Sequence, residues 1–358
     1  MNEINKELLD LCIKELEKID KKWIKRNRKI NTLSIFYHLY NSSITNIGIS
    51  TSIKLSNNFS HVALIKARQK IPNNIFYELN NIINKQKNIQ NYIYAIDGSK
   101  VRVFEGFIKY GYRTVKHNLN NTNNTNNTNN TNNRKIKGPM CMLSVLYGIQ
   151  TDSIVNYSIT KNFNEHDSIH FLIKNLKKNS IVILDRGYYS ITKNLFVSNQ
   201  IHCIMRLKKD ANKIIKTFYD SNKTSQIINI YYETKFIKMR LIKYKINKIK
   251  YIIGTSIMNE SLKYIKNLYY KRWNIELAFK RLKSHLNINK IHSRTEKLWL
   301  QEMQFRILLD TMLHTIQTKY IIQNKKNKIK YTYSYVYLIN LFKIDIYNIY
   351  IYYHQFIT

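Results

Sequence analysis

The sequence predicts an α/β fold in which helices flank a mixed β-sheet, and three observations predict it. β-branched and aromatic residues gather in short runs bounded by polar breaks between residues 91 and 206. Apolar residues recur at helical spacing in residues 1–90 and again after residue 259. The chain of 358 residues, 44% of them hydrophobic, is long enough to bury a sizeable core.

The charge of the chain points to its class of partner. It has 59 lysine and arginine residues against 22 aspartate and glutamate residues, a formal net charge of +37. An enzyme for small metabolites needs no field of this size, so a polyanionic partner is expected. Nucleic acid is the first expectation, and an anionic membrane surface is the alternative.

Cysteine usage and hydropathy indicate the compartment. Cys12, Cys141 and Cys203 are far apart and lack CxxC spacing, so neither a disulfide framework nor a zinc site is indicated. No window reaches 18 uncharged apolar residues, and the acidic residues near the N-terminus do not suit a signal peptide. We therefore expect an intracellular protein.

Residues 1–90 are predicted to form a helical N-terminal region, in which Pro72 marks a break. Within it, SHVALIKARQKIP (Ser60 to Pro72) alternates small, apolar and basic residues. A helix of a DNA-reading bundle has this composition, and so has an ordinary solvated amphipathic helix. The sequence leaves both interpretations open, and DNA binding is our expectation for the region.

From residue 91 the pattern becomes that of strands. The runs NYIYAID, VRVF, MCMLSVLYG and SIVNYSIT predict an antiparallel meander. An Asn/Thr repeat from Asn118 to Asn133 separates the second run from the third. It offers nothing to a hydrophobic core and predicts a disordered loop over residues 118–133.

Helices and strands are expected to alternate after the meander. A helix at about 165–178 precedes the strand SIVILD (Ser180 to Asp185), and a helix at about 189–198 precedes the strand IHCIMRL. Three antiparallel strands followed by this alternation is the element order of a ribonuclease-H-like core, a mixed sheet flanked by helices. Residues 91–206 are predicted to form its first part.

Residues 207–258 are predicted to form a basic, β-rich insertion. From Arg206 to Lys250 the sequence has 13 Lys or Arg against three Asp or Glu. Such a segment suits contact with a nucleic-acid backbone, although a solvated edge hairpin has the same composition. Residues 259–322 are expected to complete the core with helices at about 260–286 and 296–322, and residues 323–358 form a basic, tyrosine-rich tail.

Three carboxylates are the candidates for chemistry. Asp97 and Asp185 each follow a hydrophobic strand, at the place where open α/β sheets hold ligands. A single such aspartate is more often a turn residue, but two within this element order favour a site. Glu276, on the helix from about 260, would complete a hard-oxygen site for two Mg²⁺ ions.

One face of that helix combines acidic, basic and aromatic residues. Tyr269, Arg272, Glu276 and Lys283 stand at offsets of 3, 7 and 14 residues, which places them within one stripe of an α-helix. A solvated face of ion pairs is the alternative interpretation, but it would leave the two strand-end aspartates without a role.

These residues resemble a signature of the DDE transposases of the insertion sequence 4 family. That family has Tyr-x2-Arg-x3-Glu-x6-Lys around the catalytic Glu. The sequence has the complete pattern as Tyr269, Arg272, Glu276 and Lys283, with Trp273 directly after the arginine.

Further segments resemble the same family over roughly residues 60–310. AIDGS around Asp97 is similar to the first acidic block of the family, and ILDRGYYS around Asp185 is similar to the second. NEHDSIHF, which contains His166, and SHVALIKARQKIP are weaker matches. The spacing of 91 positions from Asp185 to Glu276 leaves room for the β-rich insertion that members have at this place.

The resemblance implies a DNA transposase that catalyses metal-dependent cleavage and strand transfer at the ends of a mobile element. Asp97, Asp185 and Glu276 would be both catalytic residues and ligands of two Mg²⁺ ions, for which Mn²⁺ substitutes. Arg272 and Lys283 would hold phosphates and Tyr269 would donate a hydrogen bond to one.

Stacking and partners are also implied by the resemblance. Trp273 would stack on an unpaired base, although packing at the helix surface is the alternative. The family cuts and pastes through a hairpin at the transposon end, but residues 207–258 contain no Trp, so Tyr or Phe would be the stacking partner there. The expected partners are double-stranded DNA, as transposon ends and target, and a second copy in a homodimeric synaptic complex, with no membrane.

Two other functions stay open at this point. A ribonuclease-H-like nuclease without strand transfer would need the same three carboxylates. A domesticated or inactive protein would bind DNA without cutting it, even with all three carboxylates present. For His166, a place near the metal ions and an ordinary surface or core position are both open.

Overall fold

The computed structural model describes residues 3–23, 30–56, 59–86, 92–116, 136–189, 201–232, 235–326 and 334–340. The Asn/Thr repeat at 118–133 lies outside these residues, as do all but the first residue of the helix expected at about 189–198 and most of the tail. Among the described residues, no helix combines the length and the apolarity needed to cross a bilayer.

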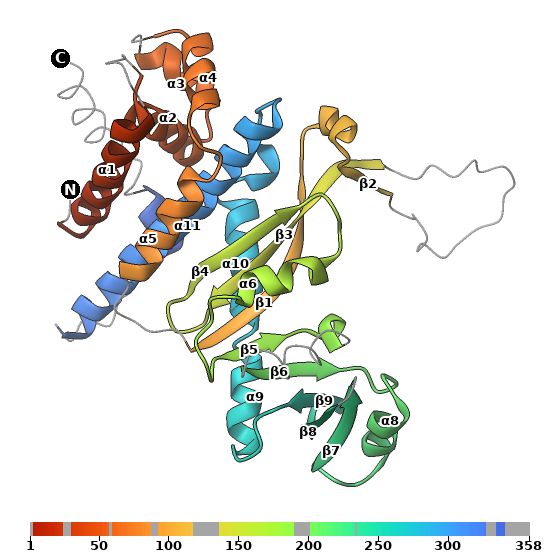
Figure 1. The fold of residues 1–358 in the computed structure, drawn as a ribbon. Coiled ribbons are helices and arrows are strands. Elements are labelled where there is room, and N and C mark those ends of the chain that lie inside the picture. Colours follow the sequence, from red (N-terminus) through yellow and green to blue (C-terminus); the bar gives the residue numbers. More distant parts are fainter. Residues whose placement is uncertain are drawn as a thin grey trace, which may run out of the picture.

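The N-terminal region is helical, as its periodicity predicts. Its helices are α1 (Glu3–Trp23), α2 (Thr32–Thr45), α3 (Ile49–Ser56), α4 (His61–Lys70) and α5 (Ile75–Gln86). Side chains cap two of them: Asn31 accepts a hydrogen bond from the Ser34 N–H, and Ser60 accepts one from the Ala63 N–H. Figure 1 shows these helices gathered around one end of the molecule, beside the long helix α11 (Glu296–Lys326).

Within the described residues, nine strands form one mixed sheet. Its order is β2-β3-β1-β5-β6-β9-β8-β7, with β4 also paired to β3. The central strands β1, β5 and β6 are parallel to one another, and the other pairs are antiparallel. The bounds are β1 Ile93–Arg102, β2 Arg113–Lys116, β3 Ile136–Gly148, β4 Ser153–Thr160, β5 Ile181–Leu184, β6 His202–Leu207, β7 Ser225–Tyr232, β8 Lys235–Ile246 and β9 Ile249–Thr255.

The two faces of the sheet belong to different parts of the core. Along β5, Ile183 joins the large cluster that contains side chains of α10 (Trp273–Ser284) and α11. Its neighbours Val182 and Leu184 join a second cluster, with side chains of α6 (Ile169–Ile173) and α8 (Lys213–Asp220). Because successive strand residues point to opposite faces, α10 and α11 cover one face and α6 and α8 cover the other.

Several elements differ from the sequence-based expectation. The run VRVF is no separate strand, because Val101 and Arg102 continue β1 by pairing with β3. The helix expected at about 165–178 consists of a 3-10 turn, η2 (Glu165–Ser168), and the short α6. Asn179, with φ at 64°, adopts the left-handed conformation that leads into β5. The insertion contains the helix α8 beside its strands, at the end of the molecule far from α1 (Figure 1).

The helix expected at about 260–286 is divided in two, α9 (Leu262–Tyr270) and α10. Between them the Arg272 N–H donates to the Tyr269 carbonyl, and the Ile275 N–H donates to the Arg272 carbonyl, both at 3.1 Å. This three-residue spacing tightens the chain into a 3-10-like turn. The remaining short 3-10 elements are η1 (Glu105–Tyr110), η3 (Arg186–Tyr188) and η4 (Ile288–Lys290).

Helix α11 packs against both the N-terminal helices and the sheet region. It contacts α1, α2, α4 and α5 on one side, and β4 and α10 on the other. A buried ion pair fixes α4 to it, with Arg68 Nη1 at 3.1 Å from Glu302 Oε1. Arg68 also donates to the Leu298 carbonyl at 2.8 Å. Arg68, which belongs to the basic run expected to suit DNA reading, is therefore a structural residue.

A buried histidine in α2 makes the stability of the N-terminal region depend on pH. His38 is fully buried, and its Nδ1 lies 2.9 Å from the Ser52 hydroxyl. Burial lowers the pKa of His38 to about 4. The unfolded chain takes up this proton near pH 6.5, whereas the folded chain does so near pH 4, so folding stability falls as the pH drops through this window.

When the pH drops from 7 to 4, the wild-type protein is therefore expected to lose roughly 3 kcal/mol more of its free energy of unfolding than the His38→Gln protein. Urea denaturation of both proteins at several pH values measures this difference. His61→Gln, which changes an exposed histidine, is the control and should keep the wild-type pH dependence. If the wild-type protein and the His38→Gln protein showed equal slopes against pH, the assignment to His38 would be wrong.

Candidate active site

The two aspartates are brought together by the register of parallel strands. Ile96 of β1 is the register partner of Leu184 of β5, the last residue of that strand. Asp97 and Asp185 are the next residues on each strand. Adjacent strands are about 4.8 Å apart, so the two backbones are neighbours at this point. By the alternation along each strand, both side chains face the side of the sheet covered by α10.

Asp97 lies within its strand, whereas its sequence context predicts a strand end. The reason is that β1 pairs on its other edge with β3, where Asp97 is the register partner of Val145. β1 therefore runs on to Arg102, although β5 stops before Asp185. β1 consequently has no β5 partner beyond Ile96 on the edge that faces Asp185.

Arg272 connects two of the three carboxylates. Its Nη1 lies 3.3 Å from Asp97 Oδ2, and its Nη2 lies 2.5 Å from Glu276 Oε1. The arginine side chain is 12% exposed, against 21% for Asp97 and 34% for Glu276. Burial by itself lowers the pKa of the guanidinium, but the surrounding Tyr269, Glu276 and aspartates outweigh it and raise the pKa. Arg272 is therefore a permanent positive charge among the carboxylates.

Tyr269 approaches the third carboxylate. Its hydroxyl donates to Asp185 Oδ1 over a long 3.4 Å. Burial and the Asp185 carboxylate raise the pKa of Tyr269, so the hydroxyl keeps its proton and acts as a donor. Tyr269, Arg272 and Glu276 thus lie on the same side, toward the sheet, on either side of the tight turn between α9 and α10. Their spacing in the sequence predicted a single helix face.

Lys283 lies in the last turn of α10 and binds the same strand as Asp97. Its Nζ donates to the Ser99 hydroxyl at 2.6 Å, and Ser99 is two residues beyond Asp97 on the same face. Burial lowers the pKa of Lys283. Lys283 is thus positioned by β1, about 10 Å along the helix axis from Glu276.

Two exposed aromatic side chains stand beside this cluster. Trp273 is 55% exposed and Tyr270 is 78% exposed. They are three residues apart across the turn between α9 and α10. Sequence reasoning singled out Trp273 and missed Tyr270, whose place before Arg272 in the run YYKRW was the available signal.

His166 lies next to the chain that follows Asp185. Its Nε2 is 3.2 Å from the Gly187 carbonyl, and its ring is 5.6 Å from that of Tyr188. These contacts make His166 a neighbour of the η3 turn.

A basic cavity of about 270 Å³ is lined by Arg186, the residue after Asp185, and by residues from 206 to 252. Tyr251 lies in its wall, with the Arg206 guanidinium 4.8 Å above its ring and the ring of Tyr244 5.7 Å away in a stacked arrangement. The sequence suggested a basic, Tyr-bearing insertion but not this convergence. The charged residues that line the cavity are Arg186, Arg206, Lys208, Lys209, Asp210 and Lys250.

The donor set suits magnesium in its chemistry. Asp97, Asp185 and Glu276 offer carboxylate oxygens, the ligands that hard divalent cations prefer. Among the described residues, no three His, Cys, Asp or Glu side chains are close enough to hold a metal ion together. Arg272 lies between Asp97 and Glu276, where its single positive charge offsets part of their two negative charges. The carboxylate chemistry fits a divalent cation, although in this arrangement it is Arg272 that connects Asp97 with Glu276.

Comparisons with known proteins agree on a class. The profile of the family described as "Transposase DDE domain" matches residues 89–309, which include all three carboxylates. Among solved structures, the fold is similar to a piggyBac transposase synaptic complex with hairpin DNA, with a TM-score of 0.53 and 11% sequence identity. The similarity covers 94% of this chain and 79% of that chain, and it confirms the predicted ribonuclease-H-like fold class. No curated protein matches the chain.

Proposed function

The chain belongs to the family of the transposase DDE domain, and on this premise we propose that it is a DNA transposase that cuts and pastes a mobile element. The observation that supports this most is the register of β1 and β5, which makes Asp97 and Asp185 neighbours under the helix that bears Glu276. Within the family, the Tyr269, Arg272, Glu276 and Lys283 pattern favours the insertion sequence 4 branch.

Asp97, Asp185 and Glu276 are the residues proposed to hold two Mg²⁺ ions, which Mn²⁺ can replace. When bound, the ions supply Lewis-acid activation of water or of a DNA 3′-hydroxyl and stabilise the leaving oxygen of the phosphodiester. Arg272 has two roles in this proposal. It offsets part of the negative charge of Asp97 and Glu276 in the free protein, and it binds a phosphate of the transposon end when DNA arrives.

Other groups around the carboxylates are suited to bind DNA. Lys283 is directed toward β1 beside Asp97, where a cation can contact a phosphate close to the scissile bond. Tyr269 has a protonated hydroxyl that can donate to a phosphate oxygen. The basic cavity lined by Arg186 extends this positive surface over the insertion.

The proposed partners are double-stranded DNA, as transposon ends and as target, and a second copy of the chain in a homodimeric synaptic complex. The similarity to a transposase solved as a synaptic complex with hairpin DNA supports the DNA partner. The second copy is proposed from the resemblance to the insertion sequence 4 family. The proposal places the protein inside the cell, with DNA.

Removal of the Trp273 side chain is expected to weaken binding to DNA ends that present an unpaired base. Stacking is worth about 1–3 kcal/mol per base, so Trp273→Ala should lose roughly tenfold or more in affinity for such DNA. The fold should tolerate the change, because the side chain is 55% exposed. Fluorescence anisotropy with duplexes that differ only in the unpaired terminal base measures the effect.

The matched control is Phe171→Ala, which removes an aromatic side chain that is 38% exposed on α6, on the opposite face of the sheet. It should leave both affinities unchanged. Equal losses by Trp273→Ala on paired and unpaired ends would show a general contact and would contradict stacking on a base.

The function is tested by strand transfer. The protein is incubated with a duplex whose end carries the 3′-hydroxyl of the element boundary, a supercoiled plasmid, and Mg²⁺ or Mn²⁺. The expected result is covalent joining of the duplex to the plasmid. Cleavage of any DNA without joining would indicate a nuclease, and binding without cleavage would indicate a DNA-binding protein; either outcome would overturn the proposal.

A further inference from the structure

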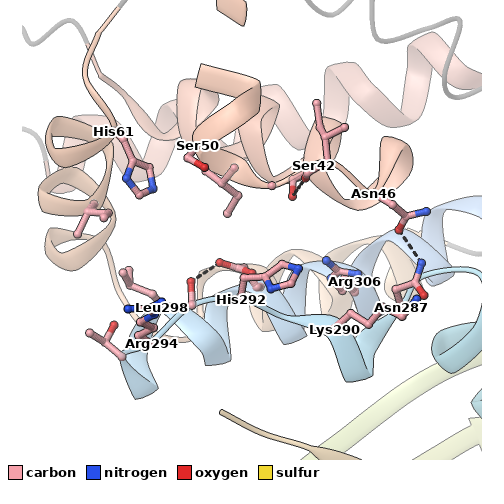
Figure 2. A pocket seen from close by; sticks show the side chains of 17 residues that line it. Ser42, Asn46, Ser50, His61, Asn287, Lys290, His292, Arg294, Leu298 and Arg306 are labelled. Atoms are coloured by element: carbon pink, nitrogen blue, oxygen red, sulfur yellow. Dashed lines mark hydrogen bonds between the residues drawn. The ribbon is translucent and has the colours of Figure 1, made fainter. Parts of the chain in front are cut away.

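A second cavity lies between the N-terminal helices and the segment that joins α10 to α11. Its volume is about 710 Å³. Figure 2 shows its two walls, one with Ser42, Asn46, Ser50 and His61, the other with Asn287, Lys290, His292, Arg294, Leu298 and Arg306. At one end a hydrogen bond of 2.6 Å from the Asn287 side-chain amide to Asn46 ties the walls together.

The lining of this cavity is positively charged. Lys290, Arg294 and Arg306 contribute three cations. Among the described residues that line it, Glu302 alone is acidic, and it is already bound by Arg68 at 3.1 Å. The field inside the cavity therefore favours an anion.

Two helices begin at the cavity. The Gly48 carbonyl accepts a hydrogen bond of 3.0 Å from the Ser52 N–H at the start of α3. Ile49 and Ser50, which line the cavity, therefore contribute backbone N–H groups of the first helical turn. Thr295 accepts the Trp299 N–H at 3.0 Å and starts α11 in the same way. The positive ends of both helix dipoles therefore add to the field of the cations.

A buried guanidinium in the wall lacks a partner for one of its donors. Arg306 is only 5% exposed, and its Nη1 donates to the Leu286 carbonyl. Its Nε is buried and has no hydrogen-bond partner. A buried donor without an acceptor is costly, and a phosphate oxygen in the cavity would supply one.

We propose that this cavity binds a phosphate of the DNA backbone at the far end of α10 from the catalytic carboxylates. The proposal rests on the proposed function for the identity of the polyanion. α10 has 12 residues and spans about 18 Å, so a duplex lying along it can meet Glu276 at one end and Lys290 beyond the other. The exposed side chains of Lys290 and Arg294 then guide the backbone to the cavity.

The test introduces a negative charge at the cavity without harm to the fold. Ser50→Glu places a carboxylate in the first turn of α3, where it suits the helix dipole but repels a phosphate. Ser50→Gln is the matched control of equal size without the charge. Binding of a duplex with the element's own end sequence is measured against salt concentration, and thermal unfolding is followed with and without inorganic phosphate.

The expected result is that Ser50→Glu lowers the affinity for the duplex at least about tenfold relative to Ser50→Gln. Lys290→Ala combined with Arg294→Ala should lower the slope of log affinity against log salt by about one or more. Lys177→Ala combined with Lys178→Ala, which removes two exposed charges outside the insertion and the N-terminal region, should lower it less.

Equal affinity of Ser50→Glu and Ser50→Gln for the duplex would overturn the proposal. The proposal would also be overturned if inorganic phosphate stabilised the wild-type protein but not Ser50→Glu, while both bound the duplex with the same affinity. The cavity would then bind free phosphate and not DNA. Cleavage of the same duplex in Mg²⁺ is followed in parallel. If the wild-type protein does not cleave the duplex, only the proposed transposase function is contradicted. The comparison of the two Ser50 variants still tests whether the cavity binds DNA.

Discussion

Replacement of Glu276 by glutamine is expected to lower metal-dependent cleavage at the element ends by roughly 10³-fold or more. A metal ligand of this kind supports several kcal/mol of charge stabilisation in the transition state, and about 4 kcal/mol corresponds to this factor. Glutamine keeps an oxygen that can accept from Arg272 Nη2, so the turn before α10 should be preserved. Single-turnover cleavage on a denaturing gel measures the effect.

Glu260→Gln is the matched control, because it removes the same charge from an exposed position just before α9. It should cleave at the wild-type rate, and both variants should bind the end duplex in the absence of divalent cations. Wild-type cleavage by the Glu276→Gln protein would remove Glu276 from the proposed ligand set.

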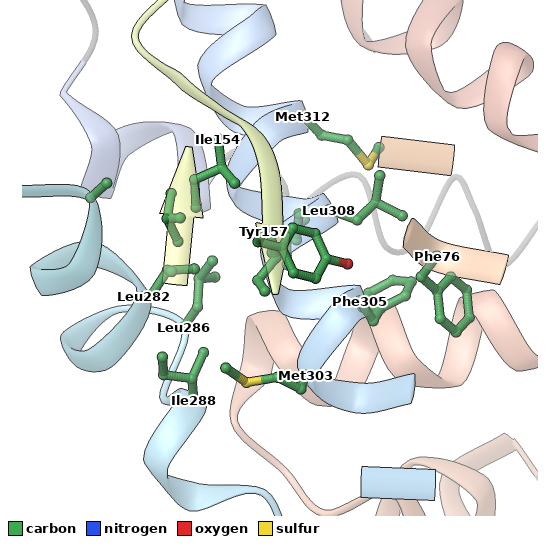
Figure 3. Close-up of a cluster of buried hydrophobic side chains, with 14 of the residues drawn as sticks. Phe76, Ile154, Tyr157, Leu282, Leu286, Ile288, Met303, Phe305, Leu308 and Met312 are labelled. Atoms are coloured by element: carbon green, nitrogen blue, oxygen red, sulfur yellow. The ribbon is translucent and has the colours of Figure 1, made fainter. Parts of the chain in front are cut away.

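The largest expected effect on stability follows from Phe305→Ala. Phe305 is fully buried in α11, and its ring meets Phe36 of α2 and Phe76 of α5 edge to face, each with centroids 5.1 Å apart. Figure 3 shows Phe305 beside Phe76 in this cluster. Truncation of such a ring costs about 3–5 kcal/mol, from lost burial and from the cavity left behind. Urea denaturation followed by circular dichroism measures the loss.

Phe305→Leu is the control that keeps most of the volume, and it should cost about 1.5 kcal/mol or less. A loss below about 1 kcal/mol for Phe305→Ala would mean that the N-terminal helices do not depend on this contact with α11.

The three candidate carboxylates could be predicted from the sequence because each stands in a recognisable local pattern. Asp97 and Asp185 follow runs of apolar, β-branched residues, and Glu276 stands in a spaced pattern with Tyr269 and Arg272. These patterns are local, and the order of strands and helices was enough to predict a ribonuclease-H-like core. The confirmed fold class rests on the same local patterns.

Other features depend on pairing between distant segments, which local patterns do not encode. Asp97 lies inside β1 because β3 supports the strand from its other edge, through Val145. The basic character of SHVALIKARQKIP suggested a surface that binds DNA. Arg68 is buried instead, and it forms an ion pair with Glu302, more than 230 residues away in the sequence. The turn at Arg272 interrupts a regular helical periodicity that gave no sign of a break.

The position of α11 bears on how the protein can evolve and be engineered. Its side chains complete the hydrophobic core of the N-terminal helices and, on the opposite side, cover β4 and α10. The first 90 residues are therefore not an exchangeable module. If they were moved to another protein without α11, apolar surfaces would become exposed both on the moved segment and on the protein it left. Substitutions on exposed faces of α3 and α4 are therefore easier to accommodate than recombination of whole segments at the boundary before β1.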